Sequence, residues 1–158
     1  MLILAINLGS TSSKYAVYRD TEPVFVETIR HPKEELAPFP DVISQQDYRR
    51  QAVLNGIREK GIDLKSLDAV VARGGLTRPL PSGTFAIDES MLNALRDPQA
   101  AKHASSLSGI IAYDIASELK VPVFTVDPVV TDELDPLARV SGYEGIERVS
   151  IFHALNQK

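Results

Sequence analysis

Residues 2–30, LILAINLGSTSSKYAVYRDTEPVFVETIR, decide the fold. The run 2–6 is solidly apolar, which is typical of a strand buried on both faces. Residues 15–18 are mostly aromatic or β-branched, and residues 23–30 form a third strand-like run after a short turn. Strands joined by links this short pair antiparallel, so the stretch predicts a three-stranded meander.

The link between the first two strands has the composition of a phosphate loop. Residues 7–14 read NLGSTSSK, with four hydroxyl side chains in a row and Lys14 at the far edge. Gly9 lets the backbone approach an anion, nearby amides can form a concavity, and hydroxyls add donors. An ordinary hairpin with a polar turn is the alternative. No helix pattern follows, so this is not the nucleotide loop that ends in Gly-Lys-Ser.

Beyond the meander, the hydrophobic pattern alternates between strands and helices. The clearest helix covers 104–119, where a broad apolar stripe recurs at helical spacing. Ser44 is the expected cap of an earlier helix, and Gly61 lies just beyond its end. The other expected elements are helices over 45–60 and 89–96, strands over 67–72 and 121–126, and a small strand over 84–87. This alternation predicts parallel strands whose crossover helices cover the sheet.

Composition narrows the class of protein. The 158 residues are 44% hydrophobic and 24% charged, which suits one folded domain with a real core. A net charge of -4 without any basic run argues against nucleic acid or an anionic membrane surface as a partner. The absence of cysteine excludes disulfides and thiolate chemistry. The start has no signal-peptide pattern, and no apolar run approaches the roughly 20 residues of a membrane span, so a cytoplasmic location is expected.

The last residues, 150–158, read SIFHALNQK and begin a helix pattern with Ser150 as its cap. Natural domains seldom end two turns into an apolar helix. We therefore expect the N-terminal part of a longer protein. Residues 1–150 would form one domain, and residues 151–158 would start a helix leading into a second domain.

Three features in a fixed order carry a family resemblance. They are the loop at 7–14, the strand that ends in Arg-Gly-Gly at 73–75, and the Asp127-Pro128 pair followed by Ile-Phe-His at 151–153. With the His-Ala-Ser run at 103–105, they resemble the N-terminal half of butyrate kinases, within the acetate and propionate kinase family. The similarity covers essentially the whole chain.

The resemblance implies an α/β fold of the ribonuclease-H-like type, shared with actin, sugar kinases and heat-shock ATPases: a mixed five-stranded sheet with helices on both faces. It implies reversible, Mg²⁺-dependent phosphoryl transfer from ATP to the carboxylate of butyrate, isobutyrate or a related acid, giving an acyl phosphate and ADP. In such kinases the other half binds most of the ATP, so the isolated chain is expected to be inactive. The full-length protein is expected to form homo-oligomers.

The resemblance also assigns roles to individual residues. Asn7 would organise the metal and phosphate region, and Asp127 would hold Mg²⁺. His153 would lie near the transferring phosphoryl group, and Arg73 would supply a positive charge facing the substrate. The remaining phosphate- or substrate-binding candidates are Gly9, Ser10, Thr11, Ser12, Lys14 and His103.

Each assignment has a structural alternative. Asp127 is also suited to a turn before Pro128, His153 to a helix core, and His103 to the entry of a helix. Acetate kinases carry their catalytic Arg where this chain has Val70, so Arg73 either grips a carboxylate or phosphate or is structural. At the level of the whole protein, the alternative is a non-catalytic phosphate-binding or oligomerisation module.

Overall fold

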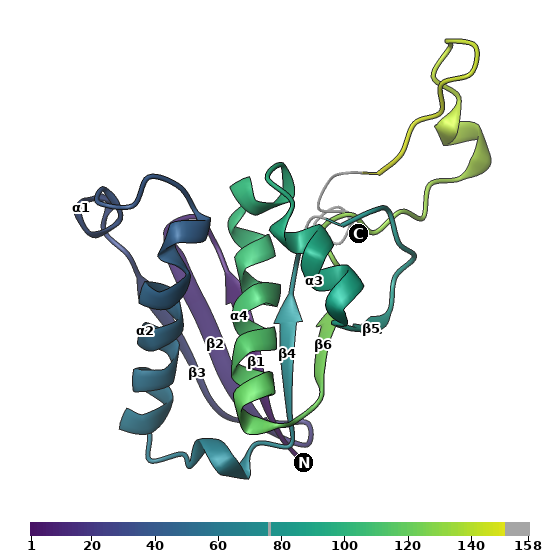
Figure 1. Ribbon diagram of the computed structural model, residues 1–158. Helices are drawn as coiled ribbons and strands as arrows, with labels where there is room; N and C mark the ends of the chain where they lie inside the picture. Colours follow the sequence, from purple (N-terminus) through teal and green to yellow (C-terminus); the bar gives the residue numbers. More distant parts are fainter. Residues whose placement is uncertain (76, 151–158) are drawn as a thin grey trace.

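The fold is built on one mixed sheet of six strands in the order β3-β2-β1-β4-β6-β5 (Figure 1). The computed structural model describes residues 1–75 and 77–150. The strands are β1 (Leu2–Leu8), β2 (Ser12–Arg19), β3 (Glu22–Arg30), β4 (Ala69–Arg73), β5 (Thr84–Ala86) and β6 (Val123–Val126).

The predicted meander and the parallel strands after it are both confirmed. β1 pairs antiparallel with β2, and β2 pairs antiparallel with β3. On its other side β1 pairs parallel with β4, which pairs parallel with β6. The sheet has one strand more than the expected five, because the short β5 adds an antiparallel pairing along the outer edge of β6.

Residues 1–75 and 77–150 also form four α-helices and four short 3-10 helices, and all of these except the last 3-10 helix lie between strands. They are α1 (Lys33–Leu36), α2 (Gln46–Glu59), α3 (Glu89–Arg96) and α4 (Ala104–Leu119), with 3-10 helices at Ile43–Gln45, Leu64–Ser66, Ala100–Lys102 and Pro136–Arg139. The bounds of α3 and α4 are those predicted. The predicted cap is wrong: Ser44 lies within a 3-10 helix before α2 and hydrogen-bonds to Asp41.

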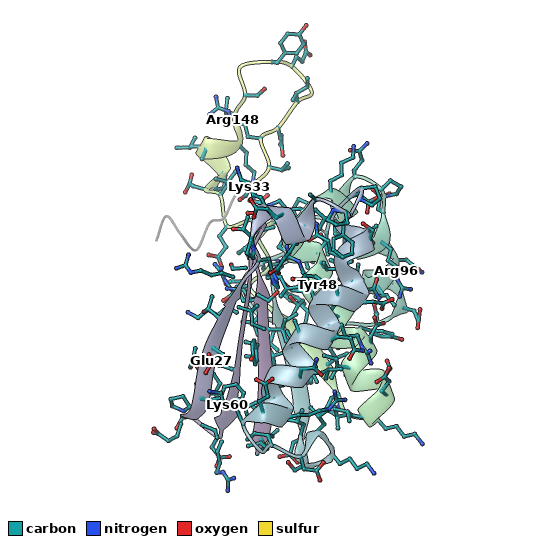
Figure 2. All side chains as sticks on the ribbon, turned by 90° about the vertical axis from the view of Figure 1, so that its left-hand side faces the viewer. Glu27, Lys33, Tyr48, Lys60, Arg96 and Arg148 are labelled. Atoms are coloured by element: carbon teal, nitrogen blue, oxygen red, sulfur yellow. The ribbon has the colours of Figure 1, made fainter. Side chains whose placement is uncertain are left out.

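The longer helices all cover the same face of the sheet, which corrects the expectation of helices on both faces. Figure 2 shows the strands on one side of the molecule and the helices on the other. The cause is the direction of the chain: β3 is parallel to β4, and both crossovers, β3 to β4 and β4 to β6, move the same way across the sheet. Right-handed crossovers that advance in one direction place their helices on one face.

The core lies between this face and the helices. Leu4 and Ile6 of β1, Val70 of β4 and the apolar side of α4 belong to one buried cluster. α3 packs on α4, since a Cβ at Gly109 would come within 2.6 Å of Leu95.

On the opposite face, no described helix covers the strands. Register places Val26, Ala16, Ala5, Val71 and Phe124 in one row across this open face. Val26 is 47% exposed. Within residues 1–75 and 77–150, no helix is both long and apolar enough to cross a membrane.

Candidate functional site

Polar side chains gather where three parallel strands end. Asn7 is near the end of β1, Arg73 ends β4, and Asp127 directly follows β6. Carboxyl ends of parallel strands lie along the same edge of a sheet, where α/β proteins usually bind ligands. Side chains alternate between faces, so Asn7 and Arg73 share the open face with Ala5 and Val71, two residues before them. Lys14 pairs in register with Asn7 and joins them.

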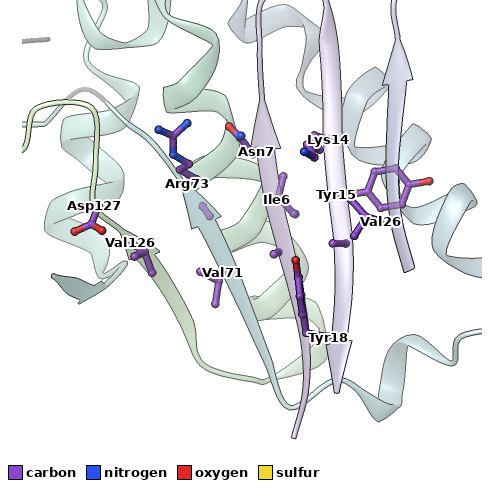
Figure 3. Close-up of a pocket in the computed structure, with 13 residues that line it drawn as sticks. Ile6, Asn7, Lys14, Tyr15, Tyr18, Val26, Val71, Arg73, Val126 and Asp127 are labelled. Carbon is purple, nitrogen blue, oxygen red and sulfur yellow. The ribbon is translucent and has the colours of Figure 1, made fainter. Parts of the chain in front are cut away.

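These four polar residues line one hollow of about 500 Å³ on the open face. Figure 3 shows the Arg73 guanidinium and the Asn7 amide at the upper ends of their strands, with Lys14 on one side and Asp127 on the other. Tyr18 and Val26 line the apolar lower part. The hollow therefore combines a mixed-charge rim with an apolar floor.

The β1–β2 loop closes tightly beside this hollow. The Gly9 amide donates to the Ser12 carbonyl at 2.8 Å, and a Cβ at Gly9 would lie 3.1 Å from Ser12 Oγ. Gly9 does not have a left-handed φ, so a larger residue here would have to displace the Ser12 hydroxyl by a few tenths of an ångström. Ser10 and Thr11 are exposed at the tip. Their backbone amides make no hydrogen bond to any described residue, as expected of an anion-binding concavity.

The loop, the end of β4 and the start of α4 enclose a second hollow of about 430 Å³. Asn7 and Arg73 line this hollow as well as the first. Gly74 has a left-handed φ of 108°, and a Cβ there would lie 2.7 Å from Ser105 Cβ. Glycine thus allows the end of β4 to pass against the first turn of α4.

His103 is the N-cap of α4, so the interpretation of this residue as a helix entry is confirmed. Only one ring nitrogen, Nδ1, makes the capping contact. Its Nδ1 accepts from the Ser105 amide at 3.3 Å and lies 2.6 Å from the Ser105 hydroxyl. The residue is exposed and lines the second hollow with Lys102. The positive end of the α4 dipole and Lys102 both favour an anion in this hollow.

Asp127 serves both as a turn residue and as part of the first hollow. Its φ is 42°, its Oδ1 accepts from the Gly83 amide at 2.8 Å, and its own amide donates to the Gly83 carbonyl. The turn interpretation is therefore confirmed, and the carboxylate still lines the first hollow.

The oxygen donors at this edge of the sheet suit Mg²⁺ only as an ion with few protein ligands. Across residues 1–75 and 77–150, no three His, Cys, Asp or Glu side chains are grouped to hold a metal. The first hollow offers one carboxylate, Asp127, and one amide oxygen, Asn7. Mg²⁺ is commonly held by one or two carboxylates together with water and substrate phosphates. These residues fit such an ion and do not form an all-protein cage.

Two buried residues behind the loop were missed by sequence reasoning. Arg49 of α2 has no exposed surface and donates to the carbonyls of Gly9, Ser10 and Ser12. The sequence did carry a signal for Arg49. It lies at four-residue spacing from Val53 and Ile57, so an arginine interrupts a helix stripe that is otherwise apolar.

The second is His31, which is 3% exposed. Its Nε2 lies 2.8 Å from Ser13 Oγ and its Nδ1 3.2 Å from the Tyr48 hydroxyl, which itself donates to Glu35. The Tyr48 proton is thus used, so Nδ1–H donates to Tyr48 and Nε2 accepts from Ser13. Burial, and then the charge of Arg49, lower the pKa of His31. The lowered pKa favours the neutral imidazole, whose Nε2 contact with Ser13 holds the start of β2.

His153 lies outside the described residues, as does the helix expected at 151–158. The boundary expected after residue 150 stays a prediction.

The sheet order and the crossovers define an α/β domain of the ribonuclease-H-like class. No family model matches the sequence. Among solved structures, the acetate kinase of Porphyromonas gingivalis is similar, with a TM-score of 0.61 and 14% identity over 99% of this chain and 46% of that one. The acetate kinase of Entamoeba histolytica gives a TM-score of 0.56 and 16% identity over 92% of this chain and 39% of that one. The chain therefore shares their fold and spans less than half their length.

Proposed function

We propose that this chain forms one wall of the active site of a carboxylate kinase. The observation that carries the proposal is the convergence of Asn7, Lys14, Arg73 and Asp127 on one hollow, beside a loop with two exposed amides that make no hydrogen bond to a described residue. The fold shared with two acetate kinases supports it. The reaction would transfer the γ-phosphoryl group of ATP reversibly to a short-chain carboxylate, giving an acyl phosphate and ADP.

The loop would bind the phosphoryl groups. Phosphoryl transfer requires alignment of the reacting groups and neutralisation of charge on the phosphate oxygens. The amides of Ser10 and Thr11 supply fixed donors, the hydroxyls of residues 10–12 add further ones, and Lys14 adds charge. Gly9 leaves room for the Ser12 hydroxyl inside this turn.

Asp127 and Asn7 would hold Mg²⁺ at the sheet edge. When bound, the ion neutralises negative charge on the phosphate oxygens and helps to align them. Because Gly83 already donates to one Asp127 oxygen, the carboxylate is oriented before any ion arrives.

Arg73 would bind the acceptor carboxylate or the transferring group. A guanidinium matches both with two parallel hydrogen bonds, and Arg73 reaches both hollows. His103 and Lys102 would bind an anion in the second hollow, and His153 would lie near the transferring phosphoryl group. The apolar floor at Tyr18 and Val26 suits an aliphatic acid such as butyrate or isobutyrate.

The test is acyl phosphate formation by the full-length protein, trapped with hydroxylamine, with ATP, Mg²⁺ and acetate, butyrate or isobutyrate as acceptor. Preferred use of butyrate or isobutyrate supports both the proposed reaction and the proposed acceptor. Preferred use of acetate keeps the reaction class and corrects the substrate. No product from any acid contradicts the proposal and favours the non-catalytic phosphate-binding module. The 158-residue chain alone is expected to give no product.

A further inference from the structure

One buried cation lies directly under the β1–β2 loop. Arg49 Nη1 donates to the carbonyls of Gly9 at 2.7 Å and Ser12 at 3.1 Å, and Nη2 donates to that of Ser10 at 2.6 Å. Its Nε donates to the Gln45 side chain at 2.9 Å. The guanidinium thus joins α2 to three carbonyls of a four-residue turn.

The planar trans peptide bond determines where the amides on the opposite side of the loop point. In a trans unit the C=O and N–H groups point in opposite directions. The Gly9 carbonyl shares a unit with the Ser10 amide, and the Ser10 carbonyl shares one with the Thr11 amide. Because both carbonyls face Arg49, both amides face away from it. These are the two amides that make no hydrogen bond to a described residue.

No acid in the described part of the chain balances the charge of Arg49. Among the described residues, no carboxylate forms an ion pair with it, and its four hydrogen bonds to these residues all go to neutral oxygens. Removing charge from water without an acidic partner is costly, so such an arrangement requires a compensating contribution. An anion on the far side of the loop would face both the two amides and this uncompensated positive charge.

We propose that Arg49 is a positioning residue that fixes the β1–β2 loop with the Ser10 and Thr11 amides directed at a bound phosphate. The use of the loop for phosphate rests on the proposed function. We call the contact between Arg49 and the loop the clamp, and it rests only on the four hydrogen bonds of Arg49. Arg49 would touch no substrate and would act through the loop that it holds, with its positive charge behind that loop.

The experiment uses the 158-residue chain, labelled with ¹⁵N, and two readouts. Backbone relaxation of Ser10 and Thr11 without ligand reports the order of the loop. Titration with inorganic phosphate, followed by the shifts of the same two amides, reports anion binding. The variants are Arg49→Met and, as matched control, Arg58→Met, which removes an exposed arginine of the same helix that donates to Asn55. Gln45→Met is the milder variant, because it removes only the partner of Nε.

The expected result is increased motion of Ser10 and Thr11 in Arg49→Met, with phosphate binding weakened by about tenfold or more, the size of a lost charge-assisted contact. Arg58→Met should behave as wild type. If Arg49→Met does not fold, Gln45→Met should show the same loosening to a smaller degree. Unchanged loop order in a folded Arg49→Met, or in Gln45→Met where Arg49→Met does not fold, overturns the clamp. The two readouts can also separate. If the loop loosens in Arg49→Met but the wild-type amides do not respond to phosphate, the clamp is upheld and the phosphate-binding role of the loop is contradicted.

Discussion

The two faces of the sheet are built in opposite ways. The helix-covered face buries Leu4, Val17 and Val70 completely, whereas on the open face Val26 is 47% exposed. Because successive side chains of a strand alternate, the strands that build the core also present Asn7 and Arg73 on the open side. The packed face holds the strand ends in place, and the open face keeps their polar side chains accessible. Under the proposed function, stability and activity would therefore depend on different faces of the same strands.

The largest difference between the faces is expected in stability. Ile110 of α4 has no exposed surface, so Ile110→Ala should lower the free energy of unfolding by about 2–5 kcal/mol, through lost burial and a cavity. Val26→Ala on the open face should cost below about 1 kcal/mol, since little burial is lost. Urea denaturation of the two variants checks this, and equal losses would contradict the distinction between the faces.

The reverse order is expected for activity of the full-length protein. Arg73→Met should lower kcat/KM for acyl phosphate formation by about 10²- to 10³-fold, the usual effect of removing one donor to developing charge. Its unfolding transition should stay near that of wild type, because Arg73 is only partly buried. The control is Arg58→Met, an exposed arginine on the helical side. A change below about threefold would favour the structural interpretation of Arg73 over substrate binding.

Much of the fold could be predicted because its signals are local. The apolar stripe of 104–119 and the pattern of 89–96 each determined a helix with the observed bounds. The placement of helices on one face could not be obtained from periodicity, since it follows from the direction in which two crossovers advance across the sheet. Ser44 failed as a cap because Asp41 engages it in a preceding 3-10 helix.

The candidate site divides in the same way. Residues at strand ends, such as Asn7 and Asp127, could be found because strand ends in α/β sheets usually face a ligand. Arg49 and His31 could not, since their roles depend on contacts 17 to 40 positions apart in the chain. An arginine within an apolar helical stripe is nevertheless a signal that can be sought in other sequences.

A substitution at Gly74 tests whether the end of β4 must lie this close to the first turn of α4. Gly74→Ala combines a left-handed φ with a Cβ placed 2.7 Å from Ser105 Cβ. Gly142→Ala is the matched control, because Gly142 has a φ of 80° and open space around it. The loss of unfolding free energy should be larger for Gly74→Ala by about 1–3 kcal/mol, the cost of overpacking. Equal losses in thermal or urea unfolding would mean that α4 can shift away from the end of β4 without cost.

The smallest expected effect is a pH dependence from His31 on the packed face. Its folded-state pKa is lowered, first by burial and then by Arg49, so the unfolded chain binds a proton at higher pH than the folded protein does. Stability from this residue is therefore complete above the unfolded pKa of about 6.5 and declines as pH falls through it toward the folded pKa. The physical reason is that a protonated Nε2 cannot accept from the Ser13 hydroxyl and places a second cation near Arg49. Urea midpoints between pH 7.5 and 5 should fall less steeply in His31→Gln than in wild type, and identical slopes would show that the imidazole tolerates the proton where it lies.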